Sequence, residues 1–400
     1  MLDRIVPLTR RRMLGAAALI GMISLLAGCA AEPASSPRAP APATRAPAPT
    51  VASEPVDDAV AGPELLLASL MHGDAVAVID PSRPDADAVT TIPVGAAPWG
   101  VGVSPDGRTG YAATAEGLAV VDLVAGERTA LVPYLHPASR ISSGEYRAGG
   151  FGLAVAPDGS RVYVAVMTEP GESLLEVFET ANGGFTASVP VGARPFDVLV
   201  APDGAWAATV DHDGFSVTVV DAATLAPTTH EIAPFGTIGG LASWEKPHYG
   251  AVDADGTILL PVQGLVVERL DPVTGTASTI PSAANSHSHG AALAPASAER
   301  GTNARLLTVG TGSFGNASGD SNLSILDLVS GEERLVPLRV PHETVAFWQN
   351  DDGAEFAVVA GGNTRELGWD GVTVIALDGL ATRELPVSGY PQAIIGFRQP

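Results

Sequence analysis

Histidines recur at one position of an internal repeat, and their spacing suggests a metal site. When the repeats are aligned, three histidines stand directly before an apolar segment, namely His248, His289 and His342. His287 lies two residues before His289, and His212 is expected to reach the same side from the preceding repeat. Imidazoles that converge from neighbouring strands suit a zinc- or copper-like ion, because ring nitrogens are common ligands of these metals. The sequence therefore predicts a divalent, zinc-like metal as a cofactor.

Acidic residues near these histidines could complete such a site. Glu343 directly follows His342, and Asp253 and Asp211 lie close to other histidines along the chain. A carboxylate can bind the ion or hold an imidazole in the required orientation. Two other interpretations stay open. The histidines could bind a different ligand, or each could only hydrogen-bond a backbone carbonyl in an acidic protein that favours their partial positive charge.

The other four repeats place aromatic or amide side chains at the same position. These residues are Trp99, Phe151, Phe196 and Gln392. Aromatic rings around an opening can stack against a ligand. Alternatively, they can pack against one another and close the opening. The four residues are therefore ligand-binding candidates with a structural alternative.

The repeat that carries these residues consists of short strands. Its clearest copy runs through alternating apolar segments at residues 75–80 and 89–95 to residues 98–107, which end in an Asp-Gly pair. Such alternation is typical of half-buried strands, and Asp-Gly favours a tight hairpin turn. The pattern occurs seven times. A period of roughly 40–55 residues with four strands per copy indicates the blades of a β-propeller.

The phase of the repeat predicts how the ring closes. In a propeller the innermost strand of a blade precedes the other three along the chain. Here the chain begins with three outer strands, residues 65–95, and ends with a single inner strand, residues 392–397. We therefore expect an all-β, seven-bladed propeller of four-stranded blades. Its C-terminal strand should complete the N-terminal blade and so remove two exposed sheet edges.

The repeat resembles that of the YVTN-repeat β-propeller lipoprotein family. The resemblance rests on the segments PVG at residues 93–95 and SPDG at residues 104–107, whose variants return along nearly all of residues 65–397. The chain is also similar, more weakly, to extracytoplasmic zinc metallochaperones with histidines at the inner rim of a propeller. That likeness implies a partner, the metal-binding protein of an importer, to which the metal is passed.

Two other functions are consistent with the same resemblance. YVTN-like propellers resemble lactonases and certain lyases, which use rim histidines and carboxylates for general acid–base chemistry. His289, His342 and Glu343 would then be the first candidates. A surface interaction scaffold without a small-molecule site is the other alternative. Because the family hosts unrelated activities, we rank binding of a metal ion or small ligand at the channel mouth above catalysis.

The N-terminus resembles an export signal that ends at a lipid attachment site. Residues 1–12 are basic, and residues 13–27 are apolar and uncharged. The segment Leu-Ala-Gly-Cys that ends at Cys29 is similar to the lipobox of bacterial lipoproteins. Residues 9–14 also resemble a twin-arginine signal.

These features divide the chain into three parts. We predict a signal peptide at residues 1–28, an Ala/Pro-rich tether with a lipidated Cys29 at residues 29–63, and the propeller at residues 64–400. The mature protein would then be anchored to the cell membrane on its extracytoplasmic face.

Charge and cysteine content exclude several functions. Removing residues 1–28 takes away four arginines and one aspartate, so the net charge of −22 becomes −25. Such a surface repels nucleic acid and anionic lipid head groups, so we expect membrane contact through the Cys29 anchor only. Cys29 is the single cysteine, which excludes an intramolecular disulfide and thiolate metal ligands in the propeller. We expect a monomer.

Overall fold

The structure is a computed structural model that describes most of the predicted propeller. The described ranges are 62–169, 171–232, 246–262, 266–284, 288–310, 320–362 and 369–400, without the side chains of Ser288 and His289. The predicted signal peptide, Cys29, nearly all of the tether and His287 therefore lie outside the described residues. Within the described ranges, no helix has the length and apolar character needed to cross a membrane.

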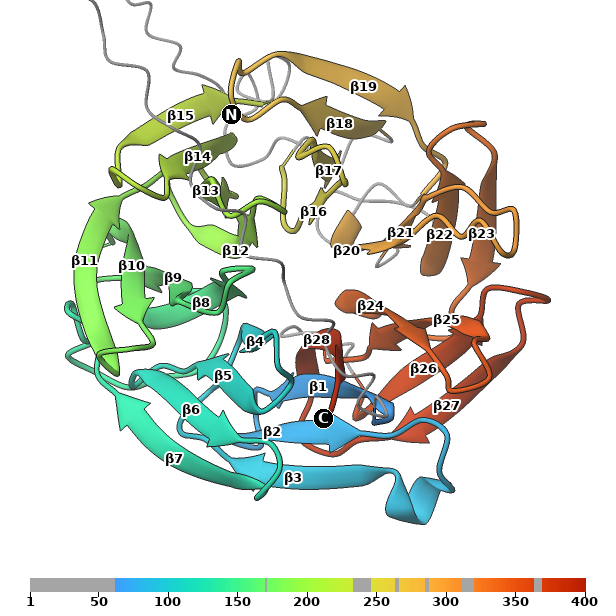
Figure 1. Ribbon diagram of the computed structural model, residues 1–400, viewed down its shortest axis with the longest axis horizontal. Coiled ribbons are helices and arrows are strands. Elements are labelled where there is room, and N and C mark those ends of the chain that lie inside the picture. The colour runs from blue at the N-terminus through green and yellow to red at the C-terminus, as the bar shows by residue number, and fades with distance from the viewer. Residues whose placement is uncertain are drawn as a thin grey trace, which may run out of the picture. The chain divides into compact units, whose positions relative to one another are not determined.

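The described residues form seven antiparallel sheets of four strands each, which stand as blades around a central channel (Figure 1). Listed from the channel outward, blade 1 consists of β28 (Pro391–Arg398), β1 (Glu64–Leu70), β2 (Ala75–Ile79) and β3 (Val89–Pro93), and blade 2 of β4 (Val101–Val103), β5 (Thr109–Ala113), β6 (Leu118–Asp122) and β7 (Glu127–Val132). Blade 3 consists of β8 (Gly149–Val155), β9 (Arg161–Met167), β10 (Ser173–Glu179) and β11 (Gly184–Pro190), and blade 4 of β12 (Pro195–Val200), β13 (Trp206–Asp211), β14 (Ser216–Asp221) and β15 (Pro227–Glu231). Blade 5 consists of β16 (Ala251–Val252), β17 (Ile258–Val262), β18 (Val266–Leu270) and β19 (Ala277–Pro281), blade 6 of β20 (Ser288–Ala294), β21 (Arg305–Gly310), β22 (Asn322–Asp327) and β23 (Glu333–Pro337), and blade 7 of β24 (Thr344–Gln349), β25 (Glu355–Ala360), β26 (Gly371–Ala376) and β27 (Thr382–Pro386). The predicted seven-bladed, all-β fold is confirmed.

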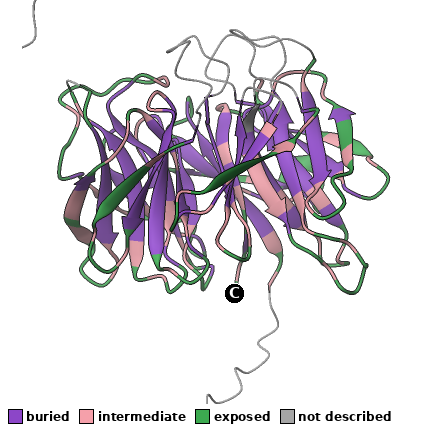
Figure 2. Cartoon of the chain, turned by 90° about the horizontal axis from the view of Figure 1, so that it is seen from above, coloured by how far each residue is buried: buried purple, intermediate pink, exposed green. Residues whose placement is uncertain are grey.

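The hydrophobic core lies between the faces of neighbouring blades. One cluster, for example, joins Leu66 and Ala77 of blade 1 to Trp348 and Val358 of blade 7. The middle strands are buried on both faces, because each blade packs against two others, whereas outer strands such as β15 are mostly exposed (Figure 2). Apolar side chains on both faces of the middle strands therefore hold the ring together.

The C-terminal strand closes the ring as the phase of the repeat predicts. β28 pairs with β1 in antiparallel register, from Arg398 opposite Glu64 to Pro391 opposite Leu70. The neighbouring blade reinforces this joint through Trp348, whose Nε1–H donates a hydrogen bond to the Glu64 carbonyl oxygen at 2.7 Å. The first and last strands of the propeller thus belong to one blade, and the predicted closure is confirmed.

Candidate functional site

Seven residues, one per blade, lie where the inner strands approach one another closely. We call them the neck: Gly100, Gly152, Asp197, Gly250, Gly290, Thr344 and Ala393. A Cβ atom added at Gly152 would lie 2.6 Å from the Cα atom of Asp197, so a larger residue could not be accommodated there. Asp197 in turn accepts a hydrogen bond from the Gly250 N–H at 3.0 Å. The Thr344 hydroxyl donates to the Gln392 carbonyl oxygen, next to Ala393, at 2.7 Å.

The residue directly before each neck residue belongs to a second ring. We call it the plug: Trp99, Phe151, Phe196, Tyr249, His289, Glu343 and Gln392. The six plug residues whose side chains are described are between 0% and 8% exposed. The described plug residues therefore fill the channel at the end where the inner strands begin.

Two of the histidines predicted in this ring lie one residue outside it. Blade 5 contributes Tyr249 and blade 7 contributes Glu343, so the predicted column of His248, His289 and His342 holds one histidine in the structure. The cause is the loop that precedes the strand. In blades 1 and 4 the plug residue directly follows a proline, whereas in blades 5 and 7 one further residue separates the two. Alignment at the proline therefore shifts the register by one.

The aromatic half of the plug is a packed cluster. The ring centroids of Trp99 and Phe151 lie 4.9 Å apart, and those of Trp99 and Phe196 lie 5.8 Å apart in a stacked arrangement. The Trp99 Nε1–H donates to the Tyr249 hydroxyl at 3.1 Å. Gln392 is fully buried in the same ring. Packing of this kind matches the structural alternative, and the ligand-binding role of these residues stays a prediction.

A buried arginine supports this cluster from the loop before β8. The Arg147 guanidinium lies 4.4 Å from the centre of the Phe151 ring, where it makes a cation–π contact. It also donates hydrogen bonds to the carbonyl oxygens of Ala97, Ala148 and Gly150. Burial lowers the pKa of Arg147 to about 10. Arg147 stands among exposed polar residues in the loop before β8, and no signal in the sequence separates it from them.

His212 and His248 come together beside the plug. Their ring centroids lie 4.3 Å apart, and His248 also stacks in parallel on Phe196 at 5.9 Å. The His212 Nδ1–H donates to the Asp213 carboxylate at 2.7 Å, and the Arg194 Nε–H donates to its other oxygen at 2.7 Å. Burial would raise the pKa of Asp213, but these two hydrogen bonds lower it to about 2. Asp213 is therefore an ionised carboxylate that fixes the orientation of His212.

His342 has different surroundings. Its Nδ1–H donates to the Val340 carbonyl oxygen at 2.8 Å, while Nε2 lies 2.8 Å from the Thr373 hydroxyl and accepts from the Trp369 indole at 3.2 Å. Burial lowers the pKa of His342 to about 4, so the ring is neutral at pH 7. A metal at Nε2 would have to displace both of these groups.

The predicted carboxylates are also separated. Asp211 is buried, and its carboxylate accepts hydrogen bonds from the hydroxyls of Thr209, Ser216 and Thr218. The bonds from Ser216 and Thr218 join neighbouring strands of blade 4 and give Asp211 a role in the fold. Asp253 follows β16, at the opposite end of the inner strand from the plug. Across the described ranges, no three histidine, cysteine, aspartate or glutamate side chains form a group that could hold a metal ion.

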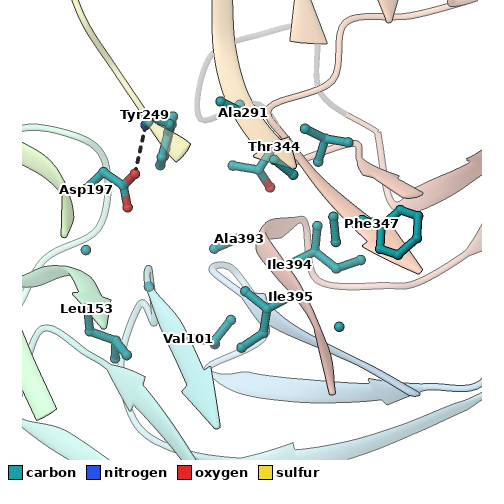
Figure 3. Close-up of a pocket in the computed structure, with 18 of the residues that line it drawn as sticks. Val101, Leu153, Asp197, Tyr249, Ala291, Thr344, Phe347, Ala393, Ile394 and Ile395 are labelled. Atoms are coloured by element: carbon teal, nitrogen blue, oxygen red, sulfur yellow. Dashed lines mark hydrogen bonds between the residues drawn. The ribbon is translucent and has the colours of Figure 1, made fainter. Parts of the chain in front are cut away.

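A cavity of about 590 Å³ occupies the channel on the far side of the plug (Figure 3). Trp99, Phe196 and Tyr249 line one end, and Glu64 and Arg398 line the other. Its principal acidic group near the plug is Asp197. Burial raises the pKa of this carboxyl to about 7, although it accepts hydrogen bonds from the backbone N–H groups of Gly250 and Val198. The sequence alone could have marked Asp197 as a candidate, because it is the one charged residue among the small residues of the neck.

We expect Asp197→Asn to stabilise the propeller in a pH-dependent way. In the unfolded chain the pKa of an aspartate is about 3.9, whereas in the folded protein that of Asp197 is about 7. Between these values the folded state holds a proton that the unfolded state has lost, so the contribution of Asp197 to wild-type stability falls as pH rises from about 4 to about 7. The melting temperature of the variant, relative to wild type, should increase over this range. An equal difference at pH 4 and pH 8 would contradict the raised pKa.

The described residues thus form a seven-bladed β-propeller whose channel is filled at one end by the plug. No protein-family model and no curated protein matches the chain. Among solved structures, it is similar to the hydrazine synthase of Kuenenia stuttgartiensis, at 17% identity, a TM-score of 0.52 and coverage of 70% of this chain and 77% of that one. It is also similar to a functionally unknown protein from Desulfotomaculum acetoxidans, at 9% identity, a TM-score of 0.59 and coverage of 84% of this chain and 99% of that one. A third similar structure is that of dihydro-heme d1 dehydrogenase NirN in complex with DHE, at 15% identity, a TM-score of 0.54 and coverage of 83% of this chain and 74% of that one. Likeness at these identities shows the fold alone.

Proposed function

We propose that the protein is an extracytoplasmic, lipid-anchored propeller that binds a divalent, zinc-like metal ion at the plug end of its channel. The observation that carries the proposal is the contact between His212 and His248, two buried imidazoles from neighbouring blades whose ring centroids lie 4.3 Å apart. Rings this close need only a small rotation to direct one nitrogen each at a shared ion, with metal–nitrogen bonds of about 2 Å.

The hydrogen bond from His212 to Asp213 supports the same role. Because Nδ1–H donates to the carboxylate, Nε2 is the nitrogen that a neutral His212 would offer to a metal. A carboxylate on the second nitrogen is a common partner of metal-binding histidines, since it fixes the ring and increases its basicity. Arg194 holds Asp213 in place from the other side at 2.7 Å.

Further ligands would come from the plug. Zinc sites use three or four protein ligands, and the described side chains supply a pair of adjacent imidazoles. His289 holds the plug position in the next blade, and we propose it as the third ligand. We propose the buried Glu343 as a fourth ligand that moves toward the ion on binding, because it forms no group with the two histidines in the described structure and carboxylates also bind zinc.

A role in metal transfer follows from the predicted location. A lipid anchor at Cys29 would hold the propeller beside membrane importers, and the net negative charge attracts cations. We therefore propose that the protein delivers its ion to the metal-binding protein of an importer.

We expect the full-length protein, loaded with zinc and desalted, to retain about one ion per chain by elemental analysis. The double variant His212→Ala/His248→Ala should retain less than about a fifth of that amount, because removing two of the proposed ligands leaves too few to complete the site.

His230→Ala is the matched control. His230 lies on the outer strand β15, where its Nε2 lies 2.9 Å from the Pro272 carbonyl oxygen. This variant should bind zinc as wild type does. Wild-type protein without bound zinc, or a double variant with an unchanged zinc content, would refute the proposed site.

A further inference from the structure

The channel cavity is a second candidate site, chemically different from the histidine pair. Three plug residues, Trp99, Phe196 and Tyr249, line it, whereas none of the proposed metal ligands does. At its far end Glu64 and Arg398 pair at 3.1 Å, with side chains that are 16% and 52% exposed, so this end meets solvent. The cavity is thus a blind pocket that opens on the face opposite the plug.

The walls of this pocket are mainly apolar. Val101, Leu153, Leu293, Val345 and Ile395 line it from five different blades, and Figure 3 labels Val101, Leu153 and Ile395 among them. Its volume of about 590 Å³ falls within the range of small-molecule sites, about 300–1,000 Å³. The pocket therefore suits a small molecule with an apolar body.

The polar groups at its inner end are few. The Thr344 hydroxyl is already used, because it donates to the Gln392 carbonyl oxygen. Each oxygen of Asp197 accepts one backbone N–H, which leaves further lone pairs on a carboxylate that offers about four acceptor sites. Among the described residues, no arginine, lysine or histidine forms an ion pair with Asp197. The carboxylate consequently lacks a counter-charge in a largely apolar pocket, which is an unfavourable arrangement for a buried ion.

We propose that the channel binds a small primary amine, with its ammonium group on Asp197 and its apolar body against the channel wall. An ammonium supplies the missing positive charge and up to three hydrogen-bond donors. An anionic ligand would be repelled, and a neutral alcohol would donate only one hydrogen bond and supply no counter-charge. The proposal is independent of metal binding.

Three six-carbon probes test the proposal on the full-length protein by titration calorimetry at pH 8, with a chelator present. Hexylamine should bind at least about tenfold more tightly than hexan-1-ol, because the ammonium supplies a counter-charge and up to three donors, whereas the alcohol supplies one donor and no charge. Hexanoate should bind most weakly. Equal affinities for the amine and the alcohol, or no amine binding, would overturn the proposal.

Two variants separate charge from shape. Asp197→Asn keeps a side-chain oxygen for the Gly250 N–H but removes the charge, so hexylamine should lose its advantage over hexan-1-ol. Ala393→Leu narrows the pocket wall without changing charge and should weaken all three probes. Amine binding that survives both substitutions would place the ligand elsewhere.

The wild-type protein provides a test that needs no variant. Hexylamine stays cationic from pH 6 to pH 8, since alkyl amines have pKa values near that of lysine, about 10.4. The pKa of Asp197 is raised to about 7, so the ionised fraction of this carboxyl falls about tenfold from pH 8 to pH 6. The amine affinity should fall by the same factor, while that of hexan-1-ol stays constant. A pH-independent amine affinity would refute the contact with Asp197.

Discussion

Deleting residues 389–400 should prevent the propeller from folding cooperatively. The deletion removes β28, whose Ile394 and Phe397 are buried, and exposes the apolar strand β1 that it covers. Each large apolar side chain contributes about 1.5–3 kcal/mol when buried, so the total loss approaches the whole stability of a typical domain, about 5–15 kcal/mol. Thermal melts followed by circular dichroism should show a broad transition or none.

A circular permutant provides the control for this deletion. Arg398 pairs with Glu64, and the Gln399 N–H donates to the Pro63 carbonyl oxygen at 3.3 Å, so the two ends of the propeller already meet. Moving residues 387–400 in front of residue 62 restores β28 as the first strand of a continuous blade. The permutant should melt sharply near the wild-type temperature. A truncated chain that melts within a few degrees of the full-length protein would show that β28 is dispensable.

Replacing Arg147 should cause the largest loss of stability among the side chains at the plug. Arg147→Met removes the donor from three buried carbonyl groups and the positive charge from the face of Phe151. An unsatisfied buried acceptor costs about 1–3 kcal/mol, and we expect a total decrease of about 3–5 kcal/mol in the free energy of unfolding. Urea unfolding measures this change, and near-ultraviolet circular dichroism reports on the packing of Trp99.

Arg140→Met is a matched substitution in the same loop. Arg140 is exposed, and surface changes of this kind usually alter stability by less than about 0.5 kcal/mol. Arg147→Lys keeps the charge but not the planar array of donors, so its effect should be intermediate. Equal stabilities of Arg147→Met and Arg140→Met would show that the buried hydrogen bonds contribute nothing.

The fold was predictable because one physical pattern recurs along the chain. Alternating apolar residues, Asp-Gly turns and a constant period define strands and their order, and these signals do not depend on long-range detail. Even the closing strand follows from the phase of the repeat. The predicted strands at residues 75–80 and 392–397 correspond to β2 and β28 within one or two residues.

The candidate site was less accessible to sequence reasoning. His212 and His248 were named and are adjacent in the structure, but the plug positions of blades 5 and 7 belong to Tyr249 and Glu343. One additional residue in the loop shifts the register by one, so that the next side chain along the chain takes the plug position. An alignment of repeats does not detect such a shift when the loops differ in length. Arg147 acts through tertiary contacts with backbone carbonyls, which leave no local pattern in the sequence.

The position of β28 also constrains when the protein can mature. Ribosomes make the chain from its N-terminus, so β28, the partner of β1, emerges more than 300 residues after β1. Blade 1 therefore cannot form its full sheet, and β1 keeps an unpaired edge, until β28 has been made. A ribosome that stalls within the last blade releases a chain with that edge uncovered, and such chains are prone to aggregation and degradation. Closure of the ring therefore requires synthesis of the chain through β28.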